Sequence, residues 1–151
     1  MSSAIVEPKR GINVDRVLVE VRVHNVDDLR RCERGEIPED RVRSASIQAS
    51  VDSGATFFCL PEDVVQQLGL PFNRERDTRS VTGSMKMRIH GGARIDVQGR
   101  ACDVEIMALP VGTQALLGQI PLETLDFWID VVNHRLVGNP EHGGQWMAEV
   151  Y

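Results

Sequence analysis

The amino-acid sequence predicts an all-β protein whose strands form a closed or nearly closed barrel. Many short segments carry the apolar pattern of strands, turn residues separate them at regular intervals, and almost none of the chain has helical periodicity. The 151 residues fit one domain that is large enough for a hydrophobic core. We expect one or two short helices, a flexible lead-in over residues 1–14, the domain over residues 15–137 and a C-terminal tail over residues 138–151.

The first predicted strand lies near residues 16–24, where every second residue is a valine and one face is therefore apolar. A charged segment follows at residues 25–43 and contains Gly35 and Pro38, which both interrupt regular structure. We expect it to be a long surface loop that joins the first strand to a second strand at residues 44–51. The apolar face of the first strand consists of Val17, Val19, Val21 and Val23.

The second strand leads into a turn at residues 52–55, and a short apolar run at residues 56–60 predicts the next strand. Residues 61–69 predict a short helix, since a proline and two acidic residues occupy its first turn and a glycine ends it.

Two hairpins are predicted in the middle of the chain. Residues 79–89 have the pattern of two strands around a turn at Thr82 and Gly83. After two consecutive glycines, residues 93–97 and 100–109 predict a second hairpin around a glutamine–glycine turn.

The last part of the domain predicts a short apolar strand at residues 114–118, a short helix at residues 120–125 and a strand at residues 127–132. A turn at Asn133 and His134 then leads into a short final strand.

Composition excludes several classes of function. A net charge of −5 and a pI near 5.3 argue against a nucleic-acid binder, which needs a basic face. No apolar run is long enough to span a membrane, and the N-terminus lacks the pattern of a signal peptide, so we expect a cytoplasmic protein without a membrane partner. The three cysteines form no Cys-x-x-Cys pair, which predicts reduced thiols and no structural zinc.

Other residues that often carry chemistry have simpler interpretations here. The four histidines share no ligand spacing and are expected to be solvated rather than to bind a metal. Three aspartates lie among strand residues without a following Ser-Gly, and we expect them to be surface charges or turn residues. They are Asp103, Asp126 and Asp130.

The tripeptide Asp52-Ser53-Gly54 lies between two strand-like runs and is the strongest candidate for a catalytic site. The glycine lets the backbone turn closely and direct an N–H group at the carboxylate, and the serine hydroxyl can tie the turn to a neighbour. The sequence contains this tripeptide only once. A reaction that uses two carboxylates would need a second copy of Asp52, so this lone aspartate predicts a homodimer in which both copies meet at a two-fold axis.

Several segments follow one another in a defined order: Val51-Asp52-Ser53-Gly54-Ala55-Thr56, the run Pro61–Leu70, Leu116-Leu117-Gly118, and residues 120–125 running into 127–132. In combination they resemble the retroviral-type, or retropepsin-like, aspartic peptidases, including single-domain bacterial members. The order of the segments carries the resemblance, which covers about residues 15–137. Three departures are Ser53 where many members have threonine, the charged insertion at residues 25–43, and Gly83 as the one glycine of the flap region.

The resemblance implies a retropepsin-like acid-protease barrel that acts as a symmetric homodimer. Asp52, Ser53 and Gly54 would be catalytic: Ser53 would hydrogen-bond across the pair of loops, and Gly54 would direct its N–H at the carboxylate. A flap and groove would bind the substrate through Ala55, Val81, Thr82, Gly83 and Ser84. The Asp52 loop would be supported by Leu116, Leu117 and Gly118.

The predicted activity is therefore an aspartic endopeptidase with no cofactor and no metal, acting on a protein or peptide substrate. The alternative is a dimeric peptide-binding or scaffold module that keeps the same fold without cleaving. The intact Asp-Ser-Gly favours the enzyme, since a binder has no need of paired buried carboxylates, which cost stability.

Overall fold

The computed structural model describes residues 16–148, apart from the side chain of Ser80. The predicted lead-in at residues 1–14 and the last three residues of the predicted tail lie outside this part of the chain. In chain order the elements are β1 (Leu18–Asn25), α1 (Val26–Glu33), η1 (Glu39–Arg41), β2 (Ser44–Val51), β3 (Phe58–Pro61), α2 (Glu62–Gln67), β4 (Phe72–Ser80), β5 (Gly83–Val97), β6 (Arg100–Leu109), β7 (Ala115–Leu117), α3 (Gln119–Thr124), β8 (Phe127–Asp130), β9 (Arg135–Gly138) and η2 (Pro140–His142).

Six strands form a closed barrel, which confirms the predicted fold class. Their order is β1-β2-β7-β3-β6-β5, and pairing between β1 and β5 closes the circle. β4 continues the sheet beyond β5 and has a free outer edge, whereas β8 and β9 form a separate two-stranded sheet. No helix within residues 16–148 has the length and hydropathy needed to cross a membrane.

The barrel interior is filled by the alternating apolar residues of its strands. All four valines predicted to form the inner face of β1 are buried, with Val21 and Val23 completely inaccessible. β1 pairs with β2 in antiparallel register, so that Val21 lies opposite Ile47. The largest side chains that are fully buried are Phe58, Leu60, Leu68, Ile89, Ile95, Ile106, Leu117 and Leu125.

The prediction of a long loop at residues 25–43 is wrong, because this segment contains α1 and η1. The Asn25 side chain caps α1 by accepting a 3.0 Å hydrogen bond from the N–H of Asp28, and its amide donates to the carbonyl of Leu68 at 2.9 Å. An ion pair of 2.8 Å between Arg43 and the buried carboxylate of Asp28 closes the segment. The sequence did hold this signal, since asparagine at a helix start followed by acidic residues is a capping pattern.

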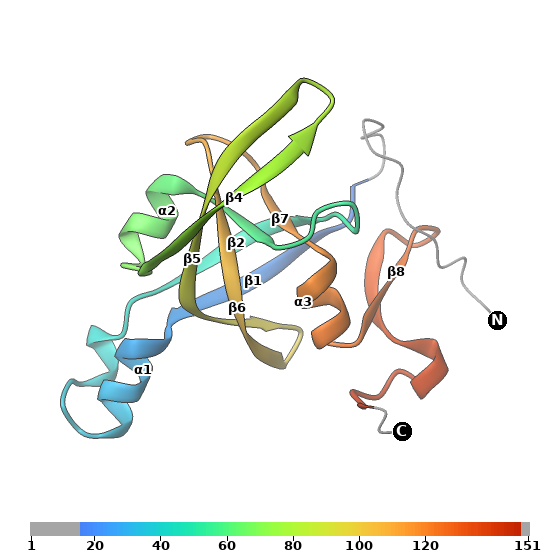
Figure 1. The fold of residues 1–151 in the computed structure, drawn as a ribbon. Helices are drawn as coiled ribbons and strands as arrows, with labels where there is room; N and C mark the ends of the chain where they lie inside the picture. The colour runs from blue at the N-terminus through green and yellow to red at the C-terminus, as the bar shows by residue number, and fades with distance from the viewer. Residues whose placement is uncertain (1–15, 149–151) are drawn as a thin grey trace.

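The β4–β5 hairpin projects from the barrel (Figure 1). Ser80 pairs with Gly83, so the turn consists of Val81 and Thr82, one residue earlier than predicted. β5 also runs unbroken through the two glycines that were expected to end it. The pairing of β5 with β6 is irregular between His90 and Ala93. The two glycines therefore allow a bulge in β5 and do not end the strand.

Candidate active site

The position of Asp52 follows from the order of three neighbouring strands in the sheet. β2 and β3 are joined by the loop of residues 52–57, but β7 lies between them in the sheet. β7 is parallel to β2, with Leu117 opposite Val51, and antiparallel to β3, with Leu117 opposite Phe58. A loop that joins two strands separated by a third must pass over the end of that third strand. The fold therefore puts Asp52 directly above the end of β7.

Hydrogen bonds to the backbone fix the position of Asp52. Its N–H donates to the carbonyl of Leu117 at 3.0 Å, and its carbonyl accepts from the N–H of Ala55 at 3.1 Å. The N–H of Gly54 donates to the Asp52 Oδ1 atom at 2.9 Å. Within residues 16–148 no other hydrogen bond or ion pair reaches this carboxylate, and Asp52 and Ser53 are partly exposed. The carboxylate is thus oriented while most of its capacity to accept hydrogen bonds stays free.

Gly118 lies so close to the Asp52 loop that only a glycine fits. A Cβ atom at this position would lie 2.2 Å from the carbonyl oxygen of Phe57 and 2.7 Å from that of Ala55. The start of α3 adds two hydrogen bonds: the N–H of Gln119 donates to Ala55 at 2.7 Å, and the N–H of Ile120 donates to the Thr56 carbonyl at 3.0 Å. Leu117 and Gly118 therefore support the loop through backbone contacts.

An apolar cluster lies beneath the loop and consists of Phe57, Cys59 and Ile89, with Leu116 packed against it. Burial raises the pKa of the Cys59 thiol to about 12, and the negative charge of Asp52 adds to this effect. A thiol with such a pKa stays protonated, so Cys59 contributes packing rather than a nucleophile to the site.

The predicted flap residues, Val81 to Ser84, occupy the tip of the β4–β5 hairpin and are all exposed. The hairpin contacts the Asp52 loop closer to the base of the hairpin. There the guanidinium carbon of Arg76 lies 5.4 Å from the centroid of the Phe57 ring. Neither residue is predicted as a site residue from the sequence. Arg76 lies in β4 and Phe57 lies in the loop of residues 52–57, and their proximity depends on how these two segments are arranged in space.

A hollow of about 200 Å³ lies beside the loop. Its two acidic residues are both neutralised by arginines: Asp103 by Arg94, at 2.6 and 3.3 Å, and Glu105 by Arg74. The hydrogen bonds from Arg74 hold the pKa of Glu105 below its ordinary value. The hollow is lined by Phe57, Asp103, Val104, Glu105, Ile120 and Pro121.

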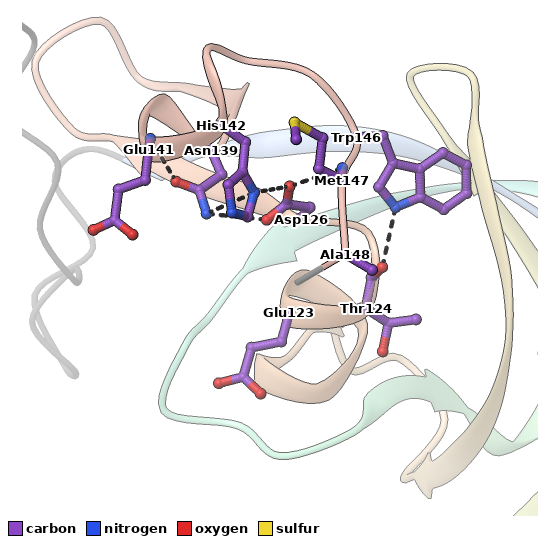
Figure 2. Close-up of a pocket in the computed structure, with 9 residues that line it drawn as sticks. All are labelled: Glu123, Thr124, Asp126, Asn139, Glu141, His142, Trp146, Met147 and Ala148. Carbon is purple, nitrogen blue, oxygen red and sulfur yellow. Dashed lines mark hydrogen bonds and ion pairs between the residues drawn. The ribbon is translucent and has the colours of Figure 1, made fainter. Parts of the chain in front are cut away.

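A second acidic region surrounds Asp126, between α3 and β8, in a pocket of about 700 Å³ (Figure 2). His142 Nδ1 lies 2.6 Å from Asp126 Oδ2, and the Asn139 amide donates to Oδ1 at 3.0 Å. The N–H of Met147 donates to Oδ2 at 3.3 Å. Burial by itself raises the pKa of Asp126, but these hydrogen bonds outweigh it and lower the pKa overall. The pocket does not include Asp52.

Several predictions about single residues need correction at this point. Asp126 does lie in a turn and Asp130 is the last residue of β8, but both are buried instead of being surface charges. Asp130 accepts hydrogen bonds from the backbone N–H groups of Val132 and Asn133, at 3.2 and 3.1 Å, and is completely inaccessible. His142 and His90 are not solvated either. His90 is 8% exposed, and its Nδ1 atom lies 3.0 Å from the carbonyl of Leu70.

Comparison with known proteins assigns the chain to a family. The family model described as aspartyl protease matches residues 39–120, more than half of the chain. The match includes the Asp52 loop, the β4–β5 hairpin and the supporting segment 116–118. No curated protein matches the chain. From the family match, and in agreement with its closed β-barrel, the chain belongs to the aspartyl protease family.

Proposed function

We propose that the protein is a retropepsin-like aspartic endopeptidase and that its active site forms between two copies of the chain, each contributing Asp52. One observation carries the proposal: a partly exposed carboxylate, with most of its hydrogen-bonding capacity free, lies on a loop that backbone contacts hold in place. The family match supports a protease, and the single Asp-Ser-Gly in the sequence supports the homodimer.

The chemistry explains why two copies are needed. Hydrolysis by this route requires two carboxylates around one water, with one proton shared between them. A single chain offers one such loop, and a two-fold axis brings identical residues together. Two-fold symmetry would therefore make the second carboxylate the Asp52 of the partner.

In the proposed reaction the ionised carboxylate removes a proton from the water as the water oxygen attacks the peptide carbonyl carbon. The protonated carboxyl donates a hydrogen bond to the carbonyl oxygen and stabilises the negative charge that develops there. A tetrahedral diol results. A proton then passes to the peptide nitrogen, the C–N bond breaks, and an acid and an amine leave the site.

The neighbouring residues have supporting roles in this proposal. Ser53 ties the two loops together with its hydroxyl, and Gly54 keeps its N–H on the carboxylate. The exposed hairpin tip, from Val81 to Ser84, closes over an extended peptide, whose backbone adds to the groove as a strand beside Ala55. The substrate is a protein or peptide in the cytoplasm, and the reaction uses no cofactor. A nucleic-acid or membrane partner is not part of this proposal.

Mixing experiments test the shared site. We expect Asp52→Asn to lower peptidase activity by about 10³-fold or more, because an amide cannot act as the base. When parent and Asp52→Asn subunits pair at random in equal amounts, a shared pair leaves about a quarter of the activity, whereas independent sites leave about half. The measurement is cleavage of a quenched-fluorescence peptide library after subunit exchange, with the dimer verified by sedimentation.

Asp103→Asn is the matched control, because it removes an exposed carboxylate of a strand that pairs with Arg94. Mixtures with this variant should keep full activity. A linear decline with the fraction of Asp52→Asn, or full activity in a strictly monomeric sample, would contradict the shared site. Peptide binding without turnover at any pH, in parent and variant alike, would instead support the scaffold function.

A further inference from the structure

We propose that Arg76 determines substrate specificity and selects peptides with an acidic side chain next to the scissile bond. This inference rests on the proposed peptidase function.

The register of the β4–β5 hairpin determines which of its faces is turned toward the Asp52 loop. Arg76 lies opposite Met87, and paired residues in an antiparallel sheet project from the same face. Met87 is 9% exposed, and Ile89, two residues further along the same face, is completely buried against Phe57 and Cys59. This face of the hairpin is thus the one that contacts the Asp52 loop, and Arg76 is on it.

The position of Arg76 is defined by an aromatic ring. Its guanidinium carbon lies 5.4 Å from the centroid of Phe57, which is itself only 4% exposed and is held by the loop that carries Asp52. A cation over a ring face is attracted by the ring's electron density. Such stacking orients a planar guanidinium while leaving the N–H groups at its edge free to bind a carboxylate with two hydrogen bonds.

No ion pair within residues 16–148 balances the charge of Arg76, although this charge also acts on the nearby carboxylate of Glu105. Among the described residues no ion pair includes Arg76, whereas Arg74 pairs with Glu105 and Arg94 pairs with Asp103. The two acidic residues of the hollow beside Phe57 are therefore both occupied. One positive charge remains at the side of the loop where a peptide would pass.

The opposite face of the hairpin differs in this respect. Glu75 lies opposite Arg88, and Asp77 lies opposite Lys86, so acids and bases compensate each other across the strands. Arg88 also lies over an aromatic ring, 4.0 Å from the centroid of Phe72. The hairpin therefore carries a stacked arginine on each face, and only Arg76 lies next to the Asp52 loop. Arg88 is a matched control.

The test compares peptides that differ only by glutamate or glutamine at each position around the cleaved bond. At one position we expect the parent to prefer glutamate in kcat/KM by about tenfold, the size expected for a charge-assisted hydrogen bond. Arg76→Gln should bring the ratio close to one, Arg76→Glu should favour a lysine peptide, and Arg88→Gln should leave the parent ratio unchanged. The preference should also weaken as salt screens the charge.

The outcomes separate this inference from the proposed function. Cleavage by the parent that is lost in Asp52→Asn but shows no acidic preference would overturn the role of Arg76 alone. An equal change of the ratio in Arg76→Gln and Arg88→Gln would also overturn it, since the effect would then be one of overall charge. If no peptide is cleaved and Asp52→Asn behaves like the parent, the peptidase function fails and the role of Arg76 fails with it.

Discussion

Asp52 and Asp126 both lie in turns of the chain, yet the protein holds them in opposite ways. At Asp52 the backbone makes the contacts, and the carboxylate accepts one hydrogen bond, from Gly54. At Asp126 the carboxylate itself makes the contacts, with His142, Asn139 and the N–H of Met147. Asp52 is partly exposed, and Asp126 is 9% exposed.

This difference shows how a structure separates a carboxylate for chemistry from a carboxylate for stability. A catalytic acid must hold a water and exchange a proton, so its oxygen atoms need free hydrogen-bonding capacity. A buried acid without partners is costly, and a structural one is therefore saturated with donors. Asp130, which accepts hydrogen bonds from two backbone N–H groups and contacts Arg135 at 3.3 Å, belongs to the second kind.

After Asp52→Asn, the largest effect is expected from a change that touches the backbone support of Asp52 rather than its carboxylate. In Gly118→Ala the new Cβ atom cannot coexist with the carbonyl oxygens of Phe57 and Ala55, so the loop must move. A displacement of about 1 Å in a catalytic group can cost about 10²-fold in rate, and we expect a loss of kcat of at least this size. Steady-state kinetics on a cleaved peptide would measure it.

Gly99→Ala is the control for this variant. Gly99 lies in the β5–β6 turn with φ +83° and no atom within 4 Å of an added Cβ, so alanine there strains the backbone by about 1–2 kcal/mol without touching the Asp52 loop. Its activity per folded molecule should match that of the parent. Equal rates for Gly118→Ala and Gly99→Ala would mean that the loop is not held by Gly118.

A smaller and different effect is expected from Asp126→Asn. In the parent, one carboxylate oxygen of Asp126 faces His142 and the N–H of Met147. In the variant an NH₂ group takes the place of this oxygen, so that it faces the N–H of Met147 donor to donor. We expect a loss of about 1.5–3 kcal/mol in the free energy of unfolding, with activity at 25 °C retained per folded molecule. Urea denaturation measures this loss. Asp103→Asn, at an exposed ion pair, should cost less than about 1 kcal/mol.

The smallest effect concerns pH. The pKa of Asp126 is lowered because its hydrogen bonds outweigh burial, and that of Asp28 is lowered chiefly by its hydrogen bond from Arg43. A lowered folded-state pKa means stability that is complete above the ordinary value of 3.8 and is lost as the pH falls through the folded-state value. The urea concentration at the midpoint of unfolding should therefore decrease as the pH falls below about 4. This decrease should be less steep in Asp126→Asn than in the parent. Parallel curves for parent and variant from pH 6 to 2.5 would contradict the role of this carboxylate.

Much of the fold could be predicted because it depends on local patterns. Valines at every second position of β1 predicted a buried face, and the Asp-Ser-Gly turn between two apolar runs predicted the loop of the site. Helix α1 differs from the predicted loop although Asn25 marks its start, because the charged residues and the glycine of this segment are also typical of a surface loop. Helix propensity predicts such a short segment poorly when a capping side chain is what stabilises the helix.

The remaining features depend on contacts between distant segments. The proximity of Arg76 to Phe57 follows from the position of β4 beside the barrel, which no local pattern specifies. The partners of Asp126 likewise come from the segment after β9, at residues 139–147. An aspartate without a Ser-Gly sequel looks like a surface charge until those partners are known, so the burial of Asp126 could not be predicted from its neighbours in the sequence.

The insertion of β7 between β2 and β3 has a consequence for the order of folding. β2 and β7 are far apart in the sequence: the hydrogen bond from the amide of Gln114, just before β7, to the Gln48 carbonyl of β2 spans 66 residues. Closing so long a loop costs entropy, and contacts of this kind slow folding. During synthesis, moreover, Asp52 leaves the ribosome long before Leu117 and Gly118 exist to support it. A growing chain therefore carries its acid without an assembled site, and the parts required for peptide cleavage can come together only when most of the polypeptide has been made.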